Sequence, residues 1–151
     1  MLEEYKKKRS FRKTPEPEGN LSAGRRGKKQ IFVVQEHHAK NLHWDFRLEM
    51  DGVLKSWAIL KGPPEKVGEK KLAVQVEDHP LEYKDFHGVI PEGQYGAGKV
   101  IIWDRGTYEL LRREPEMIEF ILYGNRLKGS FVLFHPQKFE PKNWLFLKRE
   151  D

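Results

Sequence analysis

Short runs of apolar residues, several of them alternating with polar residues, begin at Ile31 and continue to the end of the chain. They are rich in Val, Ile, Phe, Trp and Tyr, and turn residues separate them. Alternation over a few residues is typical of β-strands with one buried face. The pattern predicts strands in the runs IFVVQE, HWDFRLEM, VLKSWAIL, LAVQVE, KVIIWD, TYELLR, IEFILY, SFVLFH and WLFLKR. The one helical turn that the pattern allows lies at residues 114–118.

So many short strands in 151 residues predict an all-β fold, either a barrel or a sandwich. We expect a small single-domain β-barrel with a polar pocket, because closing a sheet removes its vulnerable edges. The segment Gly93–Gly98 has the glycines of a nucleotide-binding loop, but a strand pattern follows it instead of a helix. We therefore expect a tight hairpin there.

Asp51 and Gly52 stand between two apolar runs and predict a two-residue hairpin turn. In that register, polar side chains of the first strand face small or apolar residues of the second: Arg47 opposite Ser56, Asp45 opposite Ala58 and His43 opposite Leu60. Small partners leave space in front of the polar row, which predicts the floor of a pocket.

The net charge of +5 is unevenly distributed. Residues 1–30 carry ten Lys and Arg against four Glu, a net charge of +6. Residues 14–17, Thr-Pro-Glu-Pro, block helix and sheet there, and Phe11 could anchor the segment. We predict a basic, partly extended N-terminal arm over residues 1–29 and a barrel domain over residues 30–151. A basic arm suits nucleic acid, and a solvated tail is the alternative.

The absence of cysteine excludes disulfides, thiolate zinc sites and cysteine nucleophiles. No apolar run has the length of a membrane span, and the charged N-terminus lacks the apolar stretch of a secretory signal. We expect a cytoplasmic monomer without membrane association.

Residues 35–49, QEHHAKNLHWDFRLE, carry the candidate chemistry. Because side chains alternate along a strand, His43, Asp45 and Arg47 share one face, while Trp44 and Phe46 belong to the core face. A histidine and a carboxylate on one side can share a metal ion, with His37 or His38 as third ligand. Such nitrogen and oxygen donors suit Mn²⁺, Fe²⁺ or Zn²⁺. The alternative is a row of ion pairs on an exposed strand.

Arg47 beside a metal can hold an anion that the metal also binds, and phosphate fits the basic arm best. His79, at a strand end before Pro80, can serve as general acid, phosphate ligand or metal ligand. Lys61 could reach the same pocket mouth. A structural histidine and an ordinary surface lysine are the alternatives for these two residues.

The chain resembles the 3′-phosphoesterase family, which occurs at the N-terminus of bacterial DNA ligase D and as small stand-alone proteins. The resemblance covers roughly residues 8–148 and is carried by RSFRKTPEPEG, VVQEHHAKNLHWDFRLEMDGVLKSWAILKGP, LAVQVEDHPLEY and IPEGQYGAGKVIIWDRGTYE. It implies a compact β-barrel with one divalent metal, typically Mn²⁺, with Zn²⁺ or Co²⁺ as other ions. It also implies removal of a 3′-terminal ribonucleoside and then of the 3′-phosphate, leaving a 3′-OH before nonhomologous end joining. Any DNA ligase or polymerase partner would act in trans.

The resemblance also implies roles for individual residues. His37, His43 and Asp45 match the metal ligands, His37 because it stands six residues before His43. Arg47 and His79 match residues that contact the scissile phosphate. Four more residues match further functional positions of the family: Arg9, Glu16, Lys61 and Tyr83. Three positions depart from the family pattern: Ser10 replaces a frequent aspartate, Lys71 replaces a frequent arginine, and His38 is extra. Because Lys71 keeps the charge of that arginine, the resemblance implies that it and Lys61 bind the substrate.

Two other classes of function fit parts of the pattern. A non-haem iron oxygenase also uses a His-x-Asp motif and a distant histidine. A β-barrel that binds nucleic acid without catalysis would leave the His and Asp row structural. We expect the phosphoesterase.

Overall fold

The computed structural model describes residues 2–19 and 29–150, which are built around one antiparallel sheet. The strands are β1 (Gln30–His38), β2 (Leu42–Met50), β3 (Val53–Ile59), β4 (Lys70–His79), β5 (Gly88–Ile90), β6 (Gly98–Glu114), β7 (Met117–Tyr123), β8 (Lys128–Phe134) and β9 (Asn143–Glu150). A short helix, α1 (Glu3–Lys7), lies in the arm, and a 3₁₀ helix, η2 (Leu81–Asp85), follows β4. No helix of this part of the chain is long and apolar enough to cross a membrane.

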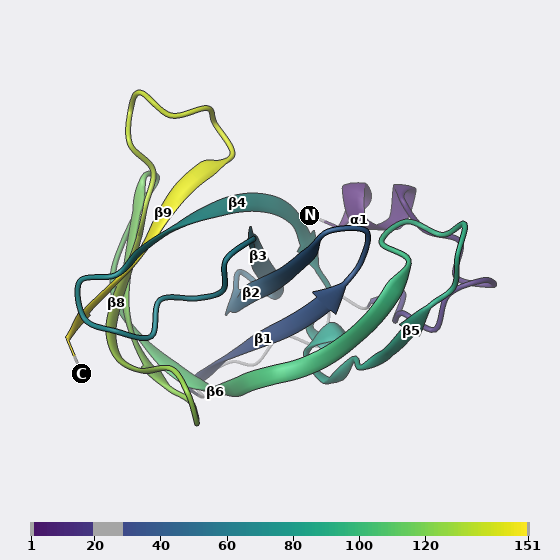
Figure 1. Cartoon of the computed structure of the whole chain (residues 1–151), viewed down its shortest axis with the longest axis horizontal. Coiled ribbons are helices and arrows are strands. Elements are labelled where there is room, and N and C mark those ends of the chain that lie inside the picture. Colours follow the sequence, from purple (N-terminus) through teal and green to yellow (C-terminus); the bar gives the residue numbers. More distant parts are fainter. Residues whose placement is uncertain (1, 20–28, 151) are drawn as a thin grey trace.

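The sheet closes on itself. Its strands follow the order β1-β2-β3-β4-β9-β8-β7-β6-β5, and β1 also pairs with β6 (Figure 1). β6 makes this closure because it is long: residues 99–108 pair with β1 and residues 107–114 pair with β7. The result is an eight-stranded barrel with β5 as an extra strand, which confirms the predicted all-β barrel.

Large aromatic side chains fill the barrel. Phe46, Phe120, Phe131 and Phe146 are fully buried, and the Phe46 and Phe146 rings lie 4.6 Å apart between centroids. Trp57 packs against them from β3. Phe46 lies on the face of β2 that the alternation of the sequence predicted to be the core face.

A second apolar layer covers the outer face of the sheet around β2 and β3. Tyr5 of the arm, Leu54 of β3, and Leu81, Tyr83 and Phe86 in and beside η2 form it. β2 is therefore buried on both faces from Asp45 to Met50. Its polar row lies between the sheet and this outer layer, which is the feature that creates the site.

The predicted hairpin is confirmed, and Asp51 and Gly52 adopt the positive φ values of 58° and 79° that such turns require. Arg47 pairs with Ser56 and Asp45 with Ala58, as expected. The expected pairing of His43 with Leu60 was wrong, because β3 ends at Ile59.

Three other details of the predicted secondary structure were wrong. KVIIWD and TYELLR belong to the single strand β6. Gly106 lies in the middle of β6 and closely approaches β7, since a Cβ there would overlap the Tyr123 carbonyl oxygen. Instead of a helical turn, residues 114–118 contain the end of β6, a two-residue turn at residues 115–116 and the start of β7. Residues 91–97 make a longer β5–β6 connection than a tight hairpin.

The aromatic core should dominate stability. We expect Phe46→Ala to lower the free energy of unfolding by about 3–5 kcal/mol, because it removes a buried ring and leaves a cavity. Urea denaturation followed by circular dichroism measures this. Phe134→Ala, at a position 37% exposed on β8, is the matched control and should cost much less. Equal losses for the two variants would contradict this account of the core.

Candidate metal and phosphate site

A pocket of about 300 Å³ lies on the outer face of the sheet. Its lining comes from β1 to β5, from the arm, from η2 and from the loop before β6. The lining residues are Arg9, His37, Ala39, His43, Asp45, Arg47, Ala58, Val76, Glu77, His79, Tyr83, Ile90, Tyr95 and Gly96. Seven of the predicted site residues thus meet in one pocket, among them Arg9 from a distant part of the chain.

His37, His43 and Asp45 form a group whose ligand atoms all lie within 4.8 Å of one another. His37 and His43 are direct partners in the β1–β2 ladder, so the pairing itself brings the rings together. Asp45 Oδ2 lies 3.4 Å from His37 Nδ1 and 3.3 Å from His43 Nε2. His38, which the residue pattern left open as a ligand, is exposed and pairs with Glu36 instead.

Backbone carbonyls orient both histidines. His37 Nε2 donates to the Gly96 carbonyl oxygen at 2.6 Å, and His43 Nδ1 donates to that of Asn41 at 3.0 Å. Because a carbonyl only accepts, these two nitrogens carry hydrogen, and the other nitrogen of each ring faces Asp45. Such second partners are usual for metal-binding histidines. Two nitrogens and a carboxylate oxygen therefore fit a divalent cation.

The charges of the group stabilise one another. Burial alone would raise the pKa of Asp45, but the Arg47 guanidinium and hydrogen bonds from His37 and His43 outweigh it and hold that pKa far below its usual range. Burial likewise opposes protonation of His43, yet the Asp45 carboxylate raises the pKa of His43. Asp45 is thus ionised, which is the state that a cation would require of it.

Arg47 is fixed on every side. It is 3% exposed, Nε donates to Gln35 Oε1 at 2.7 Å, and Nη1 donates to Ser56 Oγ at 2.8 Å. Nη2 lies 3.4 Å from Asp45 Oδ2, beside the possible ligands of a cation. A guanidinium held in this way can bind an anion without first being ordered.

Sequence reasoning missed Gln35, which is completely buried. Its side-chain amide donates to the carbonyl oxygens of Tyr83 at 2.8 Å and Phe86 at 3.1 Å while its oxygen accepts from Arg47. It therefore links Arg47 to the η2 segment. The available signal was a glutamine at the end of an apolar run, on the same face as His37.

His79 stands far from His37 and His43 in the sequence, but it is buried and lines the same pocket. Its Nδ1 lies 2.9 Å from the Glu77 carbonyl oxygen and its Nε2 lies 3.3 Å from Arg9 Nη2. Burial, together with the charges of Arg47 and Arg9, lowers the pKa of His79 well below its usual value. The imidazole is therefore neutral, with Nε2 as acceptor.

Glu16 does not line the pocket but holds two residues that do. Its Oε2 accepts from Arg9 Nε at 2.9 Å and from the Tyr83 hydroxyl at 2.6 Å. Thr14 Oγ1 donates to the other carboxylate oxygen at 3.0 Å. Burial raises the pKa of Tyr83 well above its usual value, so the hydroxyl keeps the proton that it donates. Arm and barrel thus share one buried network.

Lys61 and Lys71 are not among the residues that line the pocket. Lys71 Nζ lies 3.5 Å from the Lys61 carbonyl oxygen and 3.6 Å from Glu69 Oε2. Their contact with a substrate stays a prediction. Sequence reasoning also missed Tyr5 as the main anchor of the arm, since Tyr5 is completely buried and donates to the Pro17 carbonyl oxygen.

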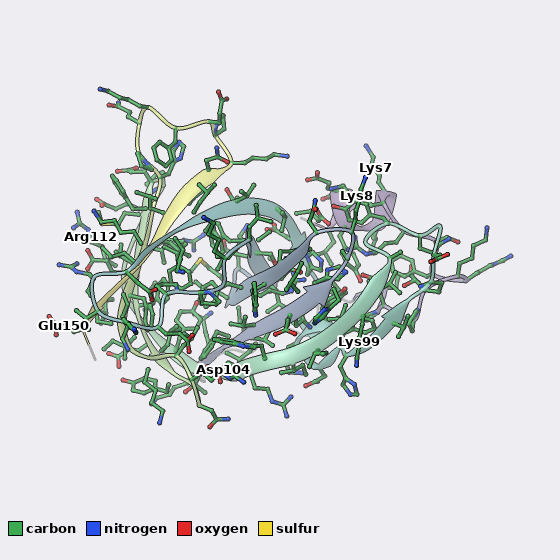
Figure 2. All side chains as sticks on the ribbon, in the orientation of Figure 1. Lys7, Lys8, Lys99, Asp104, Arg112 and Glu150 are labelled. Atoms are coloured by element: carbon green, nitrogen blue, oxygen red, sulfur yellow. The ribbon has the colours of Figure 1, made fainter. Side chains whose placement is uncertain are left out.

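Three lysines lie at the end of the molecule that carries the arm (Figure 2). Figure 2 shows Lys7 and Lys8 on the arm and Lys99 on β6, away from Arg112 and Glu150 at the other end. Arg25, Arg26 and Lys28, which contribute to the predicted basic arm, lie outside the described residues.

A cation-binding group beside a buried arginine defines a class of site that can bind an anion next to a metal ion. A model of one family, described as the DNA ligase D 3′-phosphoesterase domain, matches residues 35–135. The chain belongs to this family.

Similar proteins carry the same domain within longer chains. The multifunctional non-homologous end joining protein LigD of Pseudomonas aeruginosa is 47% identical over 99% of this chain and 19% of its own. The multifunctional non-homologous end joining DNA repair protein LigD of Mycobacterium tuberculosis is 49% identical over 87% of this chain and 18% of its own. The chain spans about a fifth of the length of these relatives.

Metal binding should depend on the three grouped residues. We expect His43→Ala to weaken Mn²⁺ binding by at least roughly 100-fold, since even partners behind the ligands are worth about 10–100-fold. Isothermal titration with MnCl₂ measures this affinity. The neighbouring variant His38→Ala should bind as the wild type does. Full affinity in His43→Ala would remove His43 from the ligand set.

The buried neutral His79 predicts a pH effect on stability. The unfolded chain takes up a proton near the ordinary pKa of 6.5, whereas the folded protein does so only at much lower pH. Stability from this group is therefore complete above that pH and falls as the pH drops below it. In His79→Asn, the slope of unfolding free energy against pH from 6.5 to 5 should fall by up to about 1.4 kcal/mol per unit. Denaturation curves recorded at several pH values measure this slope. The control is His87→Asn, since His87 is exposed and its replacement should leave the slope unchanged. An unchanged slope in His79→Asn would contradict a neutral buried ring.

Proposed function

We propose that this protein is a metal-dependent phosphoesterase that heals 3′ ends of nucleic acid. It would remove a 3′-terminal ribonucleoside and then the 3′-phosphate, leaving a 3′-OH for joining. The proposal rests on the position of Asp45: its Oδ2 lies within 3.4 Å of a side-chain nitrogen of His37, of His43 and of Arg47, all in one pocket. Membership of the DNA ligase D 3′-phosphoesterase domain family supports the same activity.

The cation would be held by His37, His43 and Asp45, and we propose Mn²⁺ from the nitrogen and oxygen donor set and the resemblance. When bound, it would neutralise a phosphate oxygen and acidify a bound water. Arg47 would stabilise the charge that develops on the phosphate oxygens, because its guanidinium is already oriented. Gln35 and Ser56 would keep that orientation throughout.

His79 would contact the phosphate through Nε2. The charges of Arg9 and Arg47 help to keep this ring neutral, and an incoming phosphate would counter them. Nε2 could then hold a proton and donate it to a phosphate oxygen or to the leaving oxygen. Arg9, positioned by Glu16, would bind a second phosphate oxygen from the arm side.

The arm would act as part of the active site and the barrel as its scaffold, with the division near residue 29. Lys61 and Lys71 would contact the nucleic acid backbone outside the pocket. Such contacts make binding weaker as salt rises. A DNA ligase or polymerase would act in trans on the healed end, by analogy with the end-joining proteins in which the relatives carry this domain.

A 5′-labelled DNA primer annealed to a template and ending in one ribonucleotide tests the proposal. With Mn²⁺ we expect loss of the terminal nucleoside, then of the phosphate, on a denaturing gel, and EDTA should stop both steps. Arg47→Lys should lower kcat by about 10²–10³-fold, since it removes an oriented donor from the developing charge.

Arg105→Lys is the matched control, because that side chain is 59% exposed on β6 and outside the pocket. It should leave both steps at the wild-type rate. A primer that binds on a native gel but is never cleaved would favour the non-catalytic nucleic-acid-binding barrel and overturn the proposal.

A further inference from the structure

Two tyrosines line the pocket, and they differ in exposure. Tyr83 is buried, whereas Tyr95 is 49% exposed. An exposed aromatic ring at the edge of a basic pocket is the type of surface on which bases of single-stranded nucleic acid stack. Neither the metal-ligand group nor the phosphate contacts proposed above use Tyr95.

Tyr95 is held in place from the protein side. Lys8 Nζ lies 3.4 Å from its hydroxyl and 4.7 Å from the centre of its ring, and Arg9 Cζ lies 5.4 Å from that centre. Its neighbour Gly96 accepts the hydrogen bond from His37 at 2.6 Å. The ring is thus fixed relative to the metal-ligand group and needs little further ordering to bind a ligand.

A glycine is needed at position 96 for the loop to lie this close to His37. Its φ of 74° lies in the left-handed region, and a Cβ there would stand 3.2 Å from Cε1 of His37. Glycine therefore lets the loop of residues 91–97 approach the metal ligand closely. The same approach brings Tyr95 to the pocket.

The size of the pocket indicates what would reach Tyr95. A molecule of liquid water takes up about 30 Å³, so 300 Å³ has room for roughly ten heavy atoms. A phosphate group together with its ribose already exceeds that number, so a base does not fit inside the pocket as well. A base attached to that sugar would have to lie at the edge of the pocket, where Tyr95 is exposed.

The arm indicates whether the base near Tyr95 belongs to the terminal nucleoside or to the continuing strand. Lys8 Nζ donates to Glu77 Oε2 at 2.9 Å while it contacts Tyr95, so this side chain of the arm bridges β4 and the loop of residues 91–97. A continuing strand would have to pass this bridge. A single terminal nucleoside can end in front of it.

We propose that Tyr95 is the stacking platform for the base of the leaving 3′-terminal nucleoside. The proposal rests on the proposed function and adds a base subsite to it. Because every base has a π-face, the subsite accepts all four bases with little preference. Removal of a bare 3′-phosphate does not use the subsite.

The test compares two substrates with the full-length protein and Mn²⁺: a primer ending in one ribonucleotide and the same primer ending in a 3′-phosphate. For Tyr95→Ala we expect kcat/KM on the ribonucleotide end to fall at least about ten-fold further than on the 3′-phosphate end, as expected for a lost stacking contact. Tyr95→Phe, which keeps the ring, should restore the wild-type ratio of the two substrates.

Tyr123→Ala is the matched control. Tyr123 is 45% exposed on β7 and has Lys29 Nζ 4.9 Å from its ring centre, but it does not line the pocket. It should leave the rates on both substrates at the wild-type values. Circular dichroism and Mn²⁺ titration establish that each variant is folded and binds metal.

A third substrate isolates the base. A primer ending in an abasic ribose should show the same smaller loss in Tyr95→Ala as the 3′-phosphate end. Equal losses on all three substrates would overturn the subsite and leave the proposed function standing. A wild-type protein that cleaves none of them would overturn the proposed function, and the subsite with it.

Discussion

The site depends on the neutralisation of buried charge between two layers. Asp45, Arg47, Glu16 and the Arg9 side chain are almost completely withdrawn from solvent, where an unpaired ion would be very unfavourable. Each has a charged partner and further hydrogen bonds: Arg47 has Asp45, and Arg9 has Glu16. Removing one partner would leave another charge uncompensated, so the network is maintained as a whole.

This network explains why the arm is integral to the described structure. Tyr5 packs against His79 and Tyr83, with ring centres 4.9 and 6.0 Å away, and Arg9 stacks on Tyr5 at 4.0 Å. The arm thereby covers the polar row of β2 with both apolar and charged groups. The burial that fixes Arg47 also lowers the pKa of His79, so packing and the protonation of the site have one common cause.

The sequence predicted more of the site than of its surroundings. Alternation placed His43, Asp45 and Arg47 on one face, and the Asp51–Gly52 turn gave Arg47 its partner Ser56, because both effects are local. The choice between His37 and His38 needed the β1–β2 register, which sets His37 opposite His43. Gln35, Glu77 and Tyr95 could not be assigned, since their partners come from distant segments.

The sequence by itself determined an all-β chain, its polar strand row and the family to which its motifs belong, because strand period and turn chemistry act over a few residues. Only the tertiary structure decided how β6 closes the barrel by pairing with β1 and how the arm reaches His79, about seventy residues away in sequence. It also decided the charge states of Asp45 and His79. These depend on burial and on charges that meet only when the two layers pack.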